Sequence, residues 1–243
     1  MQRREDSQPI EAILFDLDGT LLRVQMEHFI PRYVERLAAY CAPQIKPRRF
    51  TRAMLDAIRQ LITEEGDGRI SNEQRLFALL KHQLGIAETL LVESLAHYAN
   101  HHLDELQHLV HPIPLAQRIV KDCHRRNIPL VLATNPVFPR FMIEARMAWA
   151  ELDLRCFHHL TSYENSRYCK PQAGYFAEIA ALIKVRPERC LMVGNDSSHD
   201  LAATAVGMQT FLVDTWLVER NEKTWPSHYR GDHLALQQFL EQL

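Results

Sequence analysis

Short apolar runs alternate with helical patterns along most of the chain. The runs are "AILF" (12–15), "IPLVLAT" (128–134), "CLMVG" (190–194) and "TFLV" (210–213), with "FHHLTS" (157–162) as a weaker one. Near-continuous apolar runs of this length are typical of parallel strands covered on both faces. Helical patterns occupy 114–126, 138–150, 173–185 and 200–207, the last with Gly207 as its C-cap. The alternation predicts an α/β fold with a doubly wound, Rossmann-like parallel sheet.

One segment breaks this alternation. Between residues 22 and 111 only helical patterns occur, over 29–41, 48–63, 72–84 and 87–109. Ser71 and Gln74 form a capping box for the third of them. The prolines of "HPIP" (111–114) end the block. We therefore expect an α/β core formed by residues 1–21 and 112–243, with residues 22–111 inserted as an all-helical domain.

Composition narrows the class of protein. The chain has 243 residues, a net charge of −2 and 47% hydrophobic residues, which argues against a general nucleic-acid or membrane binder. No apolar run approaches the roughly 18 residues that span a bilayer. The polar start "MQRREDSQP" is interpreted as a frayed tail without a signal region, and the protein is expected to be soluble and cytoplasmic. Its 5 cysteines are scattered and odd in number, which favours reduced thiols over disulfides.

Polar side chains follow the ends of the predicted strands. In an open parallel sheet, ligands bind beyond the carboxyl ends of the strands, so these side chains should converge. Three of them are carboxylates, which would repel one another unless a cation lay among them. Oxygen ligands beside phosphate favour Mg²⁺. The residues are Asp16, Asp18, Thr134, Asn135, Asn195 and Asp196, with Lys170 on the loop after the third strand.

Such a set of groups suits phosphoryl transfer. One carboxylate attacks phosphorus and forms an acyl-phosphate. A second protonates the leaving alcohol and then activates water. A metal ion and a lysine offset charge on the phosphoryl oxygens. Gly19 would permit the tight turn that brings Asp16 and Asp18 to one group.

Four segments carry a family resemblance. "DLDGT", "ATN", "KP" and "GNDSSHD" resemble, in order, the four motifs of the haloacid dehalogenase-like (HAD) hydrolase superfamily. The resemblance implies that Asp16 is the nucleophile and Asp18 the general acid/base, and that the helical insert is a cap that closes the site. Asn195 departs from the pattern, since many members have an acid or a glycine there. The remaining implied roles are phosphate binding by Thr134, Asn135 and Lys170, metal binding by Asp16, by Asp18 through its backbone carbonyl and by Asp196, and support by Asn195 and Asp200.

These residues predict a Mg²⁺-dependent phosphatase of small soluble phosphomonoesters. Its expected partner is a small phosphorylated metabolite, not a nucleic acid or a membrane, and the chain would be a monomer or a homodimer. A phosphomutase would share every motif and remains open. So does a binding protein that has lost activity, although the intact motif residues argue against it. A carbon–halogen hydrolase usually lacks the second acid, so Asp18 argues against that class.

Other features have ordinary alternatives. Arg69, in the loop "EEGDGRIS", could reach the substrate or belong to a plain turn. "KPRRFTR" (46–52) could steer an anion or simply begin a helix. Cys169 could be oxidisable. A histidine cluster in the insert could bind zinc or form an exposed polar face. Its members are His97, His101, His102, His108 and His111.

Overall fold

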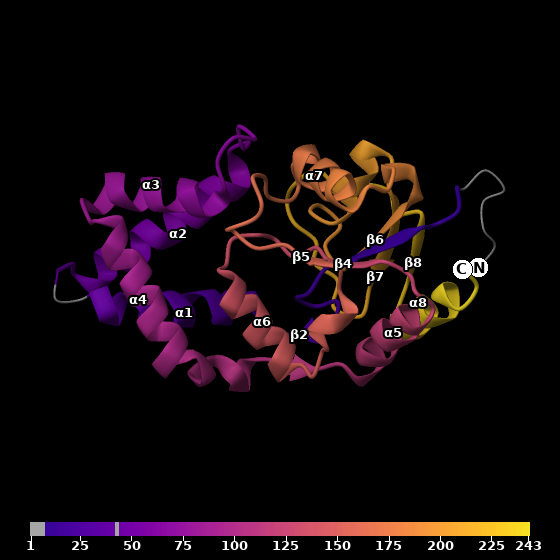
Figure 1. Cartoon of the computed structure of the whole chain (residues 1–243), viewed down its shortest axis with the longest axis horizontal. Coiled ribbons are helices and arrows are strands. Elements are labelled where there is room, and N and C mark those ends of the chain that lie inside the picture. The colour runs from indigo at the N-terminus through magenta and orange to yellow at the C-terminus, as the bar shows by residue number, and fades with distance from the viewer. Residues whose placement is uncertain (1–7, 42–43) are drawn as a thin grey trace.

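The computed structural model describes residues 8–41 and 44–243, so the polar segment 1–7 lies outside the described residues. A six-stranded sheet has the order β5-β4-β1-β6-β7-β8, and all of its neighbouring strands are parallel (Figure 1). This confirms the predicted α/β class. The strands are β1 (Ala12–Phe15), β4 (Leu130–Leu132), β5 (His159–Leu160), β6 (Cys190–Gly194), β7 (Gln209–Val213) and β8 (Tyr229–Gly231).

The register brings the motif residues to one edge. Phe15 at the end of the central strand β1 pairs with Leu132 of β4 and with Val193 of β6. The segments that follow these three positions therefore leave the sheet side by side. They carry Asp16, Thr134 and Asn195.

Side-chain alternation along β1 divides the core between two layers. Ile13 and Phe15 belong to the buried cluster that contains residues of α5 (Pro114–Arg125), α6 (Arg140–Trp149) and α8 (His233–Leu240). Ala12 and Leu14 belong to the cluster formed with α7 (Ala173–Ile183) and the 3₁₀ helix η4 (Leu201–Val206). Both faces are thus covered, as the continuous apolar runs predicted.

Two predicted elements differ in detail. The helix expected over 200–207 is the 3₁₀ helix η4, which Gly207 ends at a φ of 90°. The last predicted helix of the insert stops early. It consists of α4 (Glu88–His101) followed by the 3₁₀ helix η1 (Leu103–Leu109). Two further 3₁₀ turns, η2 (Leu154–Cys156) and η3 (Pro187–Arg189), join core elements.

The insert is helical and leaves the core through a short ribbon. Its other helices are α1 (Met26–Cys41), α2 (Pro47–Thr63) and α3 (Asn72–Leu84). The antiparallel pair β2 (Leu22–Arg23) and β3 (His111–Pro112) joins its two ends to the core. The expected capping box of Ser71 and Gln74 begins α3. Figure 1 shows α1–α4 grouped beside the sheet domain.

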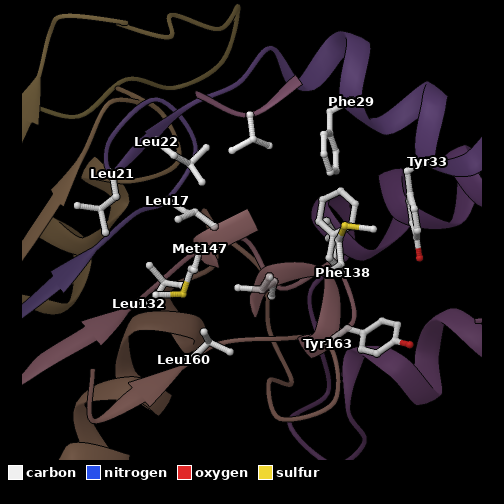
Figure 2. Close-up of a cluster of buried hydrophobic side chains, with 14 of the residues drawn as sticks. Leu17, Leu21, Leu22, Phe29, Tyr33, Leu132, Phe138, Met147, Leu160 and Tyr163 are labelled. Carbon is white, nitrogen blue, oxygen red and sulfur yellow. The ribbon is translucent and has the colours of Figure 1, made fainter. Parts of the chain in front are cut away.

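An apolar layer connects the insert to the core. Phe29 and Tyr33 of α1 lie 6.0 and 5.6 Å, between ring centroids, from Phe138 at the start of the α6 region. Figure 2 shows these rings continuing a cluster that includes Leu132 and Leu160 of the sheet. The position of α1 is therefore set by packing as well as by the ribbon. None of the helices that the structure describes is long and apolar enough to cross a membrane.

Candidate active site

Asp16 lies at the centre of the sheet edge. Its backbone NH donates to Val193 O at 2.9 Å, which extends the β1–β6 ladder by one residue. The residue is 9% exposed, and its Oδ1 accepts a hydrogen bond of 2.8 Å from Lys170 Nζ. Burial raises the pKa of Asp16, with a further increase from Asp18, although Lys170 acts in the opposite direction. The ammonium engages Oδ1, so Oδ2 would be the oxygen available to a ligand.

Lys170 joins two buried carboxylates. Its Nζ also lies 2.6 Å from Asp200 Oδ1, and the lysine is 1% exposed. Burial alone would lower the pKa of Lys170, but Asp16 and Asp200 outweigh it and raise the pKa. Burial and the neighbouring Asp16 raise the pKa of Asp200 to about 7. The lysine is therefore held as a cation beside the Asp16 carboxylate.

Asp200 needs the glycine at the end of β6. A Cβ at Gly194 would lie 2.1 Å from Asp200 Oδ2. That oxygen accepts a hydrogen bond of 2.9 Å from the NH of Asp196. Asp200 thus links the loop after β6 to Lys170.

Asn195 packs over the "DGT" turn. Gly19 has a φ of 84°, and a Cβ there would lie 2.1 Å from Asn195 Nδ2. The same amide donates to Trp216 O at 2.6 Å, and its Oδ1 accepts a bond of 3.4 Å from Thr20 Oγ1. Asn195, rather than a carboxylate, therefore contacts the turn that carries the second acid.

Asp18 is paired with an arginine that sequence reasoning missed. Arg146 Nη1 lies 2.7 Å from Asp18 Oδ1 and 2.6 Å from Oδ2, and the arginine is 0% exposed. The sequence could have indicated this residue, because Arg146 is a charged residue on the apolar face of the helix predicted over 138–150. Met142, Ile143 and Met147 are the buried neighbours on that face.

Thr134 and Asn135 follow β4. The Thr134 carbonyl accepts hydrogen bonds of 2.8 Å from both Thr161 Oγ1 and Tyr175 Oη, which fixes the loop from behind. Asn135 Nδ2 donates to Lys170 O at 3.4 Å. In the part of the chain that the structure describes, the buried Asn135 Oδ1 has no hydrogen-bond partner. A polar atom left in this state beside Lys170 suits a ligand or a water molecule.

Both carboxylate oxygens of Asp196 already have partners within the protein. Its Oδ1 accepts from the backbone NH groups of Ser198 and His199 at 2.9 and 2.8 Å, and Arg220 Nε lies 2.6 Å from Oδ2. Burial alone would raise the pKa of Asp196, but the bond from His199 and the charge of Arg220 lower it. Arg220 is 42% exposed, in the loop between β7 and β8.

The resemblance implies a metal site formed by the Asp16 and Asp196 carboxylates and the Asp18 backbone carbonyl, and one of these ligands already has a charged partner. Among the described residues, no three Asp, Glu, His or Cys side chains are grouped so that they could hold a metal ion. The oxygen donors are of the right chemical kind for Mg²⁺, but the Asp196 carboxylate is paired with Arg220. The donor set therefore suits Mg²⁺ once Arg220 leaves Asp196 Oδ2.

Comparison with known proteins settles the family. The sequence profile of the haloacid dehalogenase-like hydrolases matches residues 10–207, most of the chain. The chain belongs to this family. No curated protein matches it.

Solved HAD structures share the fold at low sequence identity. A predicted phosphoglycolate phosphatase from Haemophilus somnus is 15% identical, with a TM-score of 0.57 over 95% of this chain and 97% of that chain. A HAD phosphatase from Thermococcus onnurineus is 18% identical, with a TM-score of 0.57 over 95% and 98%. The L-2-haloacid dehalogenase from Xanthobacter autotrophicus is 17% identical, with a TM-score of 0.56 over 96% and 99%. These likenesses support the HAD fold, and the structures that share it include both phosphatases and dehalogenases.

The HAD core holds the insert beside the Lys170 loop. Gln172 Nε2 donates to the carbonyl oxygens of Leu61, Ile62 and Glu64 at 3.1–3.3 Å, which satisfies the end of α2. The buried Asn72, at the start of α3, donates from Nδ2 to Pro136 O at 3.3 Å and to Tyr168 O at 3.1 Å. The insert is therefore attached to the segments that flank both Asn135 and Lys170.

The loop with Arg69 lies against the core, and the Arg69 side chain is exposed. Gly68 O accepts from Arg167 Nη1 at 3.2 Å, and a Cβ at Gly68 would lie 2.4 Å from Tyr168 Oη. A groove of about 400 Å³ is lined by Gly68, Tyr168 and Glu178 but not by Asp16, Asp18 or Lys170. This packing gives Arg69 no contact with the carboxylates, and its proposed role in specificity stays a prediction.

The histidines and cysteines have structural surroundings. His97 and His101 stack with ring centroids 4.4 Å apart, His101 Nδ1 lies 3.0 Å from His97 O, and His102 Nδ1 lies 2.8 Å from Glu105. They are not a metal-binding group within the described chain. All 5 cysteines are buried and free, and burial raises the pKa of the Cys169 thiol to about 12, so it lacks thiolate character.

Proposed function

We propose that this HAD hydrolase cleaves small phosphomonoesters through an aspartyl-phosphate on Asp16. The observation that supports this most strongly is the pairing of the buried Asp16 with Lys170, 2.8 Å away, while a second carboxylate follows two residues later in the same turn. A nucleophile beside a fixed cation and a separate acid are the groups that the reaction needs.

The first step transfers the phosphoryl group to the protein. Asp16 Oδ2 attacks phosphorus, the bond from phosphorus to the ester oxygen breaks, and Asp18 gives that oxygen a proton. Lys170 offsets charge on the phosphoryl oxygens, since its ammonium is held next to the attacking carboxylate. The Thr134 hydroxyl and the backbone NH of Asn135 would donate hydrogen bonds to the same group.

The second step releases phosphate. Asp18, now ionised, takes a proton from water, and the hydroxide attacks phosphorus. The bond from phosphorus to Asp16 breaks, which regenerates the Asp16 carboxylate and leaves Asp18 protonated for the next turnover. The resemblance implies that Mg²⁺ adds electrostatic stabilisation of the phosphoryl oxygens when bound. Asp16, the Asp18 carbonyl and Asp196 would hold the ion, the last of these after Arg220 withdraws from Oδ2.

The helical insert would restrict the substrate to small molecules. Its attachment through Asn72 and Gln172 keeps α2 and α3 beside the loops of the site. Closure of such a cover excludes water and strengthens electrostatic interactions. A phosphorylated metabolite fits this arrangement better than a folded phosphoprotein does.

Carbon–halogen hydrolysis is the second candidate. The phosphatase proposal needs Asp18 and Asp196 in addition to Asp16, Lys170 and Asp200. Both of these additional carboxylates are paired with arginines, Asp18 with Arg146 and Asp196 with Arg220. The remaining three groups suit a displacement at carbon equally well. This candidate requires no acid, because halide leaves without a proton.

One experiment separates the two candidates. The purified protein is incubated with Mg²⁺ and a panel of phosphorylated metabolites, and in parallel with 2-halocarboxylic acids, with Asp16→Asn as the control. We expect inorganic phosphate from one substrate class and no halide. Halide release that Asp16→Asn abolishes, without phosphate release, would replace the proposal with the dehalogenase. A mutase would transfer the phosphoryl group to another hydroxyl of its substrate instead of to water, so a bisphosphate-dependent isomerisation assay accompanies the panel.

A further inference from the structure

Arg146 is a buried cation at the junction of core and insert. It lies on α6, is 0% exposed, and reaches Asp18 across the sheet edge through Nη1 alone. The Asp18 side chain is 17% exposed, so one member of the pair faces the site and the other is inside the protein. A single nitrogen within 2.7 Å of both carboxylate oxygens fixes the side-chain torsion of Asp18.

Aromatic rings hold the guanidinium in place. Its central carbon lies 5.5 Å from the ring centroid of Phe29 on α1 and 4.8 Å from that of Phe138. Both rings belong to the apolar layer between core and insert, where Figure 2 shows them close together. Cation–π attraction and packing therefore seat Arg146 from both domains.

The other donors of Arg146 do not bind oxygen. Its Nε and Nη2 are buried without a hydrogen-bond partner among the residues that the structure describes. Nη1 also contacts Met26 Sδ at 3.9 Å, a weak interaction. The buried charge is thus directed at one strong partner, Asp18. An apolar residue would fill the same space without the cost of desolvating a guanidinium, so packing alone does not account for an arginine here.

We propose that Arg146 is the positioning residue that aims the Asp18 carboxyl group at the leaving-group oxygen. The inference rests on the proposed phosphatase function and deepens it. Arg146 touches neither substrate nor the reacting atoms, and it acts only through Asp18. Because Phe29 of the insert packs on the guanidinium, the orientation of the Asp18 carboxyl group also depends on the position of α1.

The dependence on the leaving group isolates this role. A 4-nitrophenyl phosphate expels a weak base and needs little acid catalysis, whereas an alkyl phosphate needs a proton on its leaving oxygen. The value of kcat/KM reports the step in which the leaving group departs. A residue that aims the acid therefore changes the ratio of alkyl to aryl kcat/KM, whereas a residue that only supports the fold lowers both values together.

The test uses Asp18→Asn, Arg146→Met, Arg146→Lys and the double variant Asp18→Asn/Arg146→Met. Methionine keeps apolar volume without the charge, and lysine keeps one cationic donor. The matched control is Arg140→Met, on the exposed side of α6, where Arg140 pairs with Glu144. Circular dichroism checks folding, and Arg146→Gln replaces Arg146→Met if that variant does not fold.

We expect Arg146→Met to lower the alkyl-to-aryl ratio by about tenfold or more, towards the effect of Asp18→Asn. Arg146→Lys should recover part of the ratio, and Arg140→Met should leave it unchanged. In the double variant the ratio should be less than about twofold lower than in Asp18→Asn alone. Equal losses on both substrates, or a further tenfold loss in the double variant, would overturn the positioning role while leaving the phosphatase function intact. A wild-type protein that cleaves neither phosphate would instead overturn the function, and the positioning role with it.

Discussion

Lys170 Nζ lies 2.6 Å from Asp200 Oδ1 and 2.8 Å from Asp16 Oδ1, so one buried ammonium joins the proposed nucleophile, Asp16, to a carboxylate 184 positions further along the chain. Two carboxylates and one cation leave this buried group with excess negative charge when all three are ionised. Burial, followed by the charge of a neighbouring carboxylate, raises the pKa of both Asp16 and Asp200.

This relationship predicts a pH dependence of stability. Burial and the nearby Asp16 raise the pKa of Asp200 from 3.8 to about 7. Between these values the folded protein holds a proton that the unfolded chain has released. The contribution of Asp200 to stability is therefore fully present below about pH 4 and is lost as the pH rises through about 7.

The measurement compares wild type with Asp200→Asn, which does not titrate. We expect the free energy of unfolding of wild type, relative to the variant, to fall between about pH 5 and about pH 8. Urea unfolding at these pH values gives the difference, and Asp104→Asn, at an exposed carboxylate of η1, is the control. A difference that stays constant across this range would contradict the assignment.

Gly19→Ala should damage both stability and activity. The new Cβ would enter a backbone with a φ of 84° and lie 2.1 Å from Asn195 Nδ2, an atom held by Trp216 O. Gly85→Ala is the matched control, because Gly85 has a φ of 71° with nothing within 4 Å of the added carbon. Backbone strain of about 1–2 kcal/mol is common to both variants. Chemical unfolding should show an additional loss of about 1–3 kcal/mol for Gly19→Ala, and equal losses would mean that Asn195 yields freely.

Asn72→Ala tests the attachment of the insert to the core. The substitution removes an amide that bonds Pro136 O and Tyr168 O, and both carbonyls flank site loops. We expect the free energy of unfolding to fall by about 1–3 kcal/mol and kcat to decrease, because the Lys170 loop loses the hydrogen bond that Asn72 donates to Tyr168 O. The control is Asn100→Ala, at an exposed position of α4, which should change stability by less than about 0.5 kcal/mol. An unchanged kcat in a destabilised Asn72→Ala variant would separate the attachment from catalysis.

Metal dependence tests the role of Arg220. We expect phosphate release to stop in excess chelator, to return with Mg²⁺ and to return poorly with Ca²⁺, whose longer bonds would misplace Asp16. Arg220→Gln removes the cation 2.6 Å from Asp196 Oδ2, so half-maximal activity should need less Mg²⁺. Calorimetric titration of the protein with Mg²⁺ supplies a second readout. Full activity in chelator, or an unchanged Mg²⁺ requirement in Arg220→Gln, would contradict this account.

The parts of the fold that could be predicted from the sequence are those that local residue patterns determine. The run at 190–194 coincides with β6, because a strand buried on both faces needs apolar residues at every position. The positions after β1, β4 and β6 could be placed at one edge because parallel strands align their carboxyl ends. In contrast, β8 has only three residues, of mixed polarity, and no periodicity identifies it.

The pairing of charges across the site could not be predicted in the same way. Arg146 meets Asp18 across 128 positions, and Arg220 meets Asp196 from a loop without a regular pattern. Strand-end reasoning predicts which residues share an edge, but it does not predict which direction each side chain takes. That is why Asp196 was expected among the metal ligands and is observed beside Arg220.

The most direct measurement of the central claim is the identity of the phosphorylated residue. Wild type and Asp16→Asn are mixed with a substrate from the panel, quenched in acid within one turnover and digested, and the peptides are analysed by mass spectrometry. The account predicts one alkali-labile phosphoryl group on the peptide that contains Asp16, its absence in Asp16→Asn, and a fall in turnover of about a thousandfold or more. Near wild-type turnover in Asp16→Asn, or a phosphoryl group on any other residue, would contradict it.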